Sequence, residues 1–356
     1  MATQTISDNS PRSPNDSLES SKTGAPYLEI RDLRTAFPGN EKPTVVVNDV
    51  SLSLARGETL AVVGESGSGK TMTFLSALGL LPKSGRVIGG EARLSGQDLL
   101  KLPPRELRAL RGSEIAMVFQ DPLSGLNPVF RIGEQIIEAI RAHRRISRRE
   151  ARLEAIRLLE RVHIPAASSR IDDYPHQLSG GMRQRALIAM AIALDPAVLI
   201  ADEPTTALDV TVQAQILELL AGIQSETGMG MVLITHDLGL VARHADRVAV
   251  MYGGRVVEQG RLGDVFKRTR HPYTVSLFRS IPHLHTPADA ELTPIEGQPP
   301  NPAELPPGCA FEARCYLGKG RSDCANSIPA LAATDLSTHL TACHHWQELA
   351  GPGGNE

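Results

Sequence analysis

The feature that most constrains this chain is a glycine-rich segment that lies between an apolar run and a helical pattern. The apolar run covers residues 59–63, and residues 64–71 read G-E-S-G-S-G-K-T. A strand, a glycine-rich turn and a helix in that order are the context that a phosphate-binding loop requires. Glycines let successive N–H groups curl toward phosphate oxygens, and the helix N-terminus adds partial positive charge.

We therefore predict a nucleotide site on this loop. Lys70 is placed to reach the β- and γ-phosphates, and the Thr71 hydroxyl is placed to ligate Mg²⁺. The residues expected to contact the nucleotide here are Gly64, Glu65, Ser66, Gly67, Ser68, Gly69, Lys70 and Thr71.

Composition and charge narrow the class of protein. The chain has 356 residues, of which 41% are hydrophobic and 22% charged, as in an ordinary globular protein. Its formal net charge of −3 gives no support to a nucleic-acid partner. No run of about 18 uninterrupted apolar residues and no leader-like N-terminus is visible, so we expect no membrane span, no secretory signal and a cytoplasmic location.

The pattern along the chain predicts four parts. Residues 1–26 are rich in Ser, Asn, Pro and Thr, and we expect them to be disordered because they have little apolar surface to bury. Residues 27–265 alternate strand and helix patterns and should form the main α/β domain. Within it, residues 121–185 carry mainly helical patterns. From residue 266 to 356 prolines accumulate, which favours a second, smaller, loop-rich module.

One segment in the helical region is strongly basic. Between residues 141 and 152 there are six arginines, and a basic helix can bind RNA or lipid. Because Glu150 and Glu154 interleave and no aromatic residue accompanies the arginines, a solvated helix face is the favoured interpretation.

Two acidic residues follow an apolar run that is typical of a strand buried on both faces of a parallel sheet. The run covers residues 197–201, and Asp202 and Glu203 come next. Asp202 can hold the Mg²⁺ shell, while Glu203 points the other way and can polarise an attacking water. The alternative role for such a pair is to cap a helix N-terminus.

Two further polar residues end predicted strands. Gln120 follows the run 115–119, and His236 follows the run 231–235. Open α/β sheets bind ligands at the carboxyl ends of their strands, so both residues are candidates for the site. Taken alone, each could equally be a structural residue at a strand end.

Two other candidates are less specific. Ser179, Gly180 and Gly181 open a helical pattern and could offer a hydroxyl and backbone N–H groups to an anion, or simply start a helix. Phe37, upstream of the loop, could stack on a base or be a half-buried strand residue.

Taken together, these motifs resemble the ATP-binding cassette family over roughly residues 28–265. Six of that family's motifs occur in its order: the Walker A loop (64–71), the Q-loop (Gln120), the signature motif (178–182), the Walker B strand (198–203), the D-loop (207–209) and the switch histidine (His236). Met182 stands where the commonest signature has Gln. Since Ser179 and both glycines are intact, we expect phosphate binding to survive.

The resemblance implies a P-loop NTPase fold with a RecA-like core, a helical subdomain and an N-terminal antiparallel β part. It implies Glu203 as the catalytic base, His236 and Gln120 as further catalytic residues, and ATP with Mg²⁺ as cofactors. Thr71, Gln120 and Asp202 would hold the Mg²⁺. In this family two cassettes pair head to tail, so the signature residues and Asp209 would contact ATP held by the other cassette.

The tail narrows the resemblance further. Residues 270–274, 295–300 and 307–315 resemble oligopeptide/dipeptide importer ATPases. That implies a peripheral protein on the cytoplasmic face of the membrane. Its partners would be a second ATPase subunit, with a different chain favoured over a second copy of this one, two transmembrane permease subunits and an extracytoplasmic solute-binding protein. Relatives that import nickel, glutathione or other small solutes share this tail, and a soluble ATPase acting on ribosomes or DNA is a further alternative.

All four cysteines lie in the tail, with the spacing C-x5-C-x8-C-x18-C. In a reducing compartment that clustering favours a metal over disulfides. Four thiolates suit a [4Fe–4S] cluster or a structural Zn²⁺. Some members of the subfamily that the chain resembles carry an iron–sulfur cluster at these cysteines, which favours the cluster over zinc or no metal. The expected ligands are Cys309, Cys315, Cys324 and Cys343.

Overall fold

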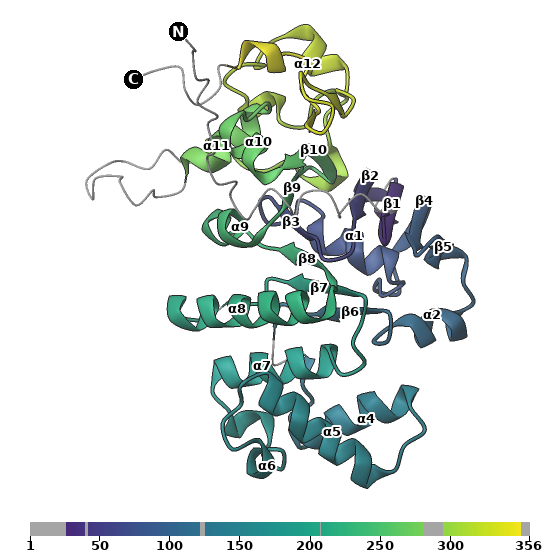
Figure 1. The fold of residues 1–356 in the computed structure, drawn as a ribbon. Helices are drawn as coiled ribbons and strands as arrows, with labels where there is room; N and C mark the ends of the chain where they lie inside the picture. Colours follow the sequence, from purple (N-terminus) through teal and green to yellow (C-terminus); the bar gives the residue numbers. More distant parts are fainter. Residues whose placement is uncertain (1–25, 40–41, 122–124, 207, 281–294, 350–356) are drawn as a thin grey trace, which may run out of the picture.

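The computed structural model describes residues 26–39, 42–121, 125–206, 208–280 and 295–349. The predicted disordered segment lies outside these residues except for Pro26, and so does Ala207 of the D-loop motif. The described chain is an α/β protein with two sheets, a helical region below them in Figure 1, and the tail above them.

The larger sheet has eight strands in the order β11-β12-β10-β9-β3-β8-β7-β6. Strands β6, β7, β8, β3 and β9 are parallel, and the strands beyond β9 are antiparallel. Every residue of β3, β7 and β8 is buried, because continuous apolar runs suit strands covered on both faces. The strand bounds are β3 Thr59–Val63, β6 Ile115–Val118, β7 Val198–Asp202, β8 Gly230–Ile234, β9 Arg247–Tyr252, β10 Arg255–Arg261, β11 Ala332–Ala333 and β12 Leu340–Thr341.

The smaller sheet is antiparallel, in the order β2-β1-β4-β5. Its strands are β1 Leu28–Phe37, β2 Thr44–Leu54, β4 Arg86–Leu94 and β5 Gln97–Asp98. Strand β2 is irregular at Asp49, where φ is 55°. Gly90 lies inside β4. There φ is 90° and the backbone passes so close to Leu33 that a side chain would overlap it.

Helices cover the larger sheet on both sides. They include α1 Lys70–Ala77, α2 Pro104–Leu110, α8 Val210–Thr227 and α9 Leu238–His244. Phe74 of α1 is fully buried in the core that the two sheets share. Among the described residues, no helix combines the length and the apolar character that crossing a bilayer requires.

The helical region consists of α4 Ile132–His143, α5 Arg148–Arg161, α6 Ala167–Arg170 and α7 Gly180–Ala191. Ile132, Ile136 and Ile140 recur at helical spacing on α4 and are completely buried against the other helices. The α5 N-terminus carries a capping box in which Ser147 and Glu150 satisfy each other's backbone N–H groups.

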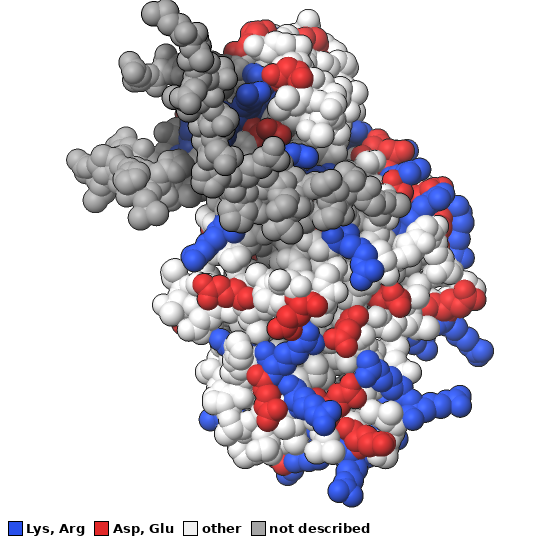
Figure 2. Space-filling model, in the orientation of Figure 1, with Lys and Arg blue, Asp and Glu red and all other residues white. Residues whose placement is uncertain are grey.

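The arginine-rich segment is not one helix, since α4 ends at His143 and α5 begins at Arg148. Three of its six arginines pair with acidic side chains: Arg144 with Glu154 (2.5 Å), Arg152 with Asp172 (2.6 Å) and Arg148 with Glu134. Figure 2 shows acidic and basic side chains interleaved over this region. The favoured interpretation as a solvated surface therefore agrees with the structure.

The tail, predicted as a second, smaller, loop-rich module, packs closely on the larger sheet. It contains α10 Leu262–Lys267, α11 Pro272–Arg279 and α12 Ser322–Asn326. Strand β12 pairs with β10 of the larger sheet, through Glu258 opposite Thr341. Tyr252 of β9, Tyr273 of α11 and Phe311 of the tail are fully buried against one another, with ring centroids 4.5–5.4 Å apart. The tail and the sheet thus share one core.

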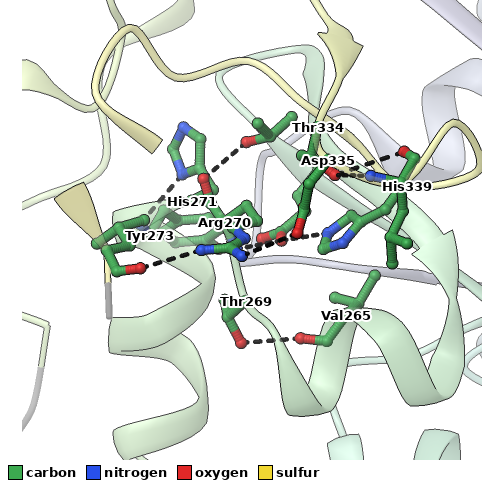
Figure 3. A network of polar contacts seen from close by, with 12 residues as sticks. Val265, Thr269, Arg270, His271, Tyr273, Thr334, Asp335 and His339 are labelled. Carbon is green, nitrogen blue, oxygen red and sulfur yellow. Dashed lines mark hydrogen bonds and ion pairs between the residues drawn. The ribbon is translucent and has the colours of Figure 1, made fainter. Parts of the chain in front are cut away.

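A buried polar network joins the tail to the sheet (Figure 3). His339 Nε2 lies 2.8 Å from Glu258 Oε1, and both side chains are fully buried. The same Glu258 oxygen accepts the backbone N–H of Arg270 (2.6 Å), and Thr341 donates its hydroxyl to the Arg270 carbonyl (2.9 Å). A buried carboxylate needs such donors, because leaving it unpaired is costly.

Replacing His339 with Ala should therefore destabilise the protein, because it leaves the Glu258 carboxylate buried without its side-chain donor. Breaking a buried pair in this way costs roughly 3–5 kcal/mol, which should lower the urea concentration at the unfolding midpoint. His163→Asn, at an exposed position with φ 57°, is the matched control and should leave the midpoint unchanged. An unaltered midpoint for His339→Ala would contradict the assigned role.

Candidate functional site

The glycine-rich loop connects β3 to α1 and folds as the sequence predicts. Gly64 has φ 147°, and a Cβ atom there would overlap the carbonyl oxygen of Met251 on the neighbouring strand β9. Gly69 has φ 97° and is the N-cap of α1. Only glycine adopts such backbone angles without strain, so the turn that curls the loop depends on these two residues.

Lys70 lies inside the curl of the loop. Its Nζ donates to the carbonyl oxygens of Gly64 (2.7 Å) and Glu65 (3.0 Å). Burial lowers the pKa of Lys70, while the nearby carboxylates of Glu203 and Asp202 oppose that shift. A desolvated ammonium of this kind is a strong site for an anion such as a phosphate.

Thr71 and Asp202 meet beside the loop. Thr71 Oγ1 donates to Asp202 Oδ1 at 3.0 Å, and Asp202 is the buried last residue of β7. Burial raises the pKa of Asp202 to about 6. The hydrogen bond from Thr71 lowers this pKa, whereas the negative charge of Glu203 raises it further. A hydroxyl and a buried carboxylate fit Mg²⁺, which prefers oxygen ligands and would offset the cost of burying the charge.

Glu203, which follows β7, is contacted by side chains that follow the neighbouring strands β6 and β8. Its carboxylate accepts hydrogen bonds from Gln120 Nε2 (2.8 Å) after β6 and from His236 Nδ1 (3.2 Å) after β8. Thr206, which the sequence did not single out, donates its hydroxyl to the same carboxylate at 2.8 Å. The structure thus brings together three residues predicted separately from three strand ends.

The backbone of Glu203 is held in an uncommon conformation. Its φ is 44°, in the left-handed region, and its N–H donates to the Ile234 carbonyl at 2.9 Å. A residue other than glycine keeps such a conformation only where its surroundings enforce it, and such residues cluster at functional sites. The two adjacent acids have different partners: Asp202 accepts from Thr71, whereas Glu203 accepts from Gln120, Thr206 and His236.

The signature residues and Asp209 are not gathered with this site. Ser179 is the N-cap of α7, and its hydroxyl accepts the N–H of Met182 (3.3 Å). Asp209 is the N-cap of α8 and accepts the N–H of Val212 (3.0 Å). Both side chains are exposed, and no hydrogen bond among the described residues joins either of them to residues 64–71. Their roles in nucleotide binding therefore remain predictions.

Phe37 ends β1 and is half-buried. Its ring lies so close to Gly85 that a Cβ atom there would be 2.8 Å from Phe37 Cζ. The Phe37 ring therefore packs against Gly85, as the side chain of a half-buried strand residue does. Its stacking on a base stays a prediction.

The four cysteines are brought to one place in the tail. None of them forms a disulfide, and together they line one small cavity of about 20 Å³. The N–H of Gly318 donates to Cys315 Sγ at 3.1 Å, and a Cβ atom at Gly318 would lie 3.0 Å from Cys324 Sγ. Burial raises the pKa of all four thiols, to about 11 for Cys324 and about 12 for Cys343.

This donor set fits a metal centre. Thiols with raised pKa values stay protonated unless a cation stabilises their thiolates. A single zinc with four thiolates would need sulfurs about 3.8 Å apart, given a Zn–S bond of about 2.3 Å. Among the described residues, the one group of three or more His, Cys, Asp or Glu residues whose ligand atoms all lie within 4.8 Å of one another is Asp323, Cys324 and His345, so the four cysteine sulfurs are not gathered this closely.

Two family models match the chain. Residues 47–206 match the model described as ABC transporter, and residues 257–324 match that described as Oligopeptide/dipeptide transporter, C-terminal region.

Curated relatives match over almost their whole length. The oligopeptide transport ATP-binding protein OppD of Salmonella typhimurium is 47% identical over 332 residues, which cover 92% of this chain and 97% of that protein. A Brucella melitensis protein with the provisional name peptide import ATP-binding protein is 49% identical over 336 residues, which cover 91% of this chain and 98% of that protein.

Solved structures match the larger part of the chain. A dimeric post-hydrolysis state of the ATP-binding cassette MJ0796 with ADP and Pi has a TM-score of 0.60 at 27% identity, covering 66% of this chain and 98% of that one. The structure of cbiO1 from Clostridium perfringens, part of an ABC transporter complex, has a TM-score of 0.58 at 28% identity, covering 68% of this chain and 90% of that one.

Proposed function

The chain belongs to the ABC transporter ATP-binding family, and on that premise we propose that it is the ATP-hydrolysing subunit of an importer of di- and oligopeptides. The family and the P-loop α/β fold predicted from the six sequence motifs are confirmed. The observation that supports the ATPase chemistry best is the convergence of Gln120 and His236 on Glu203, beside the Thr71–Asp202 pair.

The hydrolytic step follows from the roles of these residues. Glu203 acts as general base for in-line attack of water on the γ-phosphate, and His236 and Gln120 hold its carboxylate in place. Lys70 offsets the charge that develops on the phosphate oxygens. Thr71, Gln120 and Asp202 would hold Mg²⁺, which would supply further positive charge at the phosphates.

One chain provides only part of each nucleotide site in this proposal. Ser179, Gly180, Gly181 and Asp209 are placed at the N-termini of α7 and α8, where backbone N–H groups and helix dipoles favour anions. They would contact ATP held on residues 64–71 of a second cassette, and Phe37 would stack on the base of this chain's own ATP. The second cassette is a different subunit or another copy of this chain.

The tail supports the importer class and the solute. It matches the oligopeptide/dipeptide transporter region, and the relatives named for peptide import match from end to end. The proposed assembly adds two transmembrane permease subunits and an extracytoplasmic binding protein, with this chain on the cytoplasmic face. Nickel, glutathione or another small solute is the alternative cargo. The proposed domains are residues 27–265, with a helical subdomain near 121–185, and residues 266–356.

We also propose a [4Fe–4S] cluster on Cys309, Cys315, Cys324 and Cys343, with Zn²⁺ or no metal as the alternatives. The shared cavity, the unpaired thiols and the Gly318 N–H bond to Cys315 Sγ support it, since such hydrogen bonds tune iron–sulfur clusters. The cluster would crosslink a part of the chain that has little regular secondary structure.

Glu203→Gln should keep ATP binding but lower the hydrolysis rate by at least about a hundredfold, because the amide cannot accept the proton from water. It should also accumulate an ATP-bound dimer. Phosphate release and size-exclusion chromatography with ATP measure both effects. Glu218→Gln, an exposed acid on α8, is the control. Hydrolysis by Glu203→Gln at close to the wild-type rate would show that another group is the base.

Lys70→Ala should abolish uptake of labelled di- and oligopeptides in cells whose other peptide importers have been deleted. The substitution removes the ammonium that holds the phosphates, so transport loses its energy source. Uptake of nickel and glutathione, measured alongside, should persist. Loss of nickel or glutathione uptake with unchanged peptide uptake would assign the alternative cargo.

Protein purified without oxygen should contain about four iron and four sulfide per chain. Cys315→Ser should lose most of both, because the hydroxyl is a poor ligand for iron. Ser327→Ala, in the same part of the chain, is the control. Stoichiometric zinc without sulfide would favour the zinc site, and a metal-free protein would rule out both.

A further inference from the structure

The tail reaches the phosphate-binding loop at Glu65. Arg314, in the short helix η5 (Glu312–Arg314), donates from Nη1 to Glu65 Oε2 (2.7 Å) and from Nη2 to Glu65 Oε1 (3.0 Å). Tyr273 of α11 accepts the backbone N–H of Glu65 at 2.8 Å. Both the side chain and the backbone of one loop residue are therefore held by residues more than 200 positions away.

The guanidinium of Arg314 is itself rigidly placed. Its side chain is only 6% exposed, and Nε donates to the Glu296 carbonyl at 2.8 Å. Nη1 also donates to the Tyr252 hydroxyl (3.1 Å), and the group lies 5.8 Å from the centre of the Tyr252 ring. The hydrogen bond to Glu65 contributes most to the raised pKa of Arg314. The guanidinium group is therefore positively charged at any physiological pH.

The charge of Glu65 makes this contact relevant to the nucleotide. The Glu65 backbone carbonyl accepts from Lys70 Nζ at 3.0 Å, and the charge of the Glu65 carboxylate also acts on Lys70, where it opposes the effect of burial on the pKa. An unpaired carboxylate there would repel a polyphosphate, and the repulsion would be strong because the loop is partly buried. The bidentate Arg314 contact neutralises that charge and fixes its direction.

We propose that Arg314 is a positioning residue of the nucleotide site: by pairing with Glu65 it sets the charge and shape of the phosphate-binding loop, so that the tail controls ATP affinity. This inference rests on the proposed ATPase function. It assigns the tail a direct part in nucleotide binding, in addition to any part in binding a metal.

The alternative role for the contact is a simple staple that holds the tail against the cassette. The two roles predict different outcomes for a double substitution. If Arg314 acts by neutralising Glu65, removing the Glu65 charge as well should restore affinity. If the contact only holds the tail against the cassette, replacing Glu65 as well as Arg314 should not restore the affinity for ATP.

The experiment measures binding of fluorescent ATP to the full-length chain, with thermal unfolding to check folding. Arg314→Met, which keeps the aliphatic stem, should raise Kd for ATP about tenfold or more. The double variant Arg314→Met/Glu65→Gln should return Kd to within about threefold of wild type. Arg314→Lys keeps the positive charge but loses the two parallel hydrogen bonds of the guanidinium, so its Kd for ATP should lie between those of wild type and Arg314→Met. If Arg314→Met does not fold, Arg314→Lys with and without Glu65→Gln provides the same comparison.

Arg321→Met is the matched control. Arg321 makes the same bidentate contact in the tail, to Glu348 at 2.8 Å through both nitrogens, but this pair is exposed and makes no described contact with the loop. Its Kd for ATP should equal that of wild type.

Three results would overturn the proposal. The first is a Kd for ATP of Arg314→Met within twofold of wild type. The second is a Kd of the double variant as high as that of Arg314→Met. Neither of these results would contradict the proposed ATPase function. A wild-type chain that binds no ATP would overturn the proposed function together with this inference.

Discussion

The parallel pairing of β6, β7, β8 and β3 is the constraint on which the site depends. It brings the carboxyl ends of four strands to one edge of the sheet, so that Gln120, Glu203 and His236 meet although they are far apart in sequence. Because side chains alternate along a strand, a slip of one residue in β7 would turn Asp202 away from Thr71. The fully buried apolar strands make such a slip costly, and thereby protect the chemistry at their ends.

The tail is built into the same framework. Its strand β12 extends the larger sheet, its aromatic residue Phe311 completes a core with Tyr252 and Tyr273, and Arg314 reaches the phosphate-binding loop. A change in the packing of the tail would therefore act on the loop through a few short, directional contacts. The same segment carries the cysteines, so a metal centre there and the nucleotide site would be structurally linked.

Much of this could be predicted because the motifs are local. The loop 64–71 and the buried apolar runs are patterns within a few residues, where propensity and structure agree. Features that depend on long-range packing give no such local signal. Gly90 has φ 90° inside β4, where its backbone passes close to Leu33 on β1. Thr206 gave no signal because its role depends on the turn after Glu203.

The sequence by itself determined the nucleotide chemistry, since glycines, a lysine and strand-end acids at fixed spacings suit one kind of ligand. It also placed the four cysteines in one segment. Only the tertiary structure decided that this segment joins the larger sheet and touches the loop. The pairing of Arg314 with Glu65 links positions 249 residues apart, and no local pattern marks it. The physical reason is that such contacts arise from how whole elements pack, and packing depends on the entire core rather than on neighbouring residues.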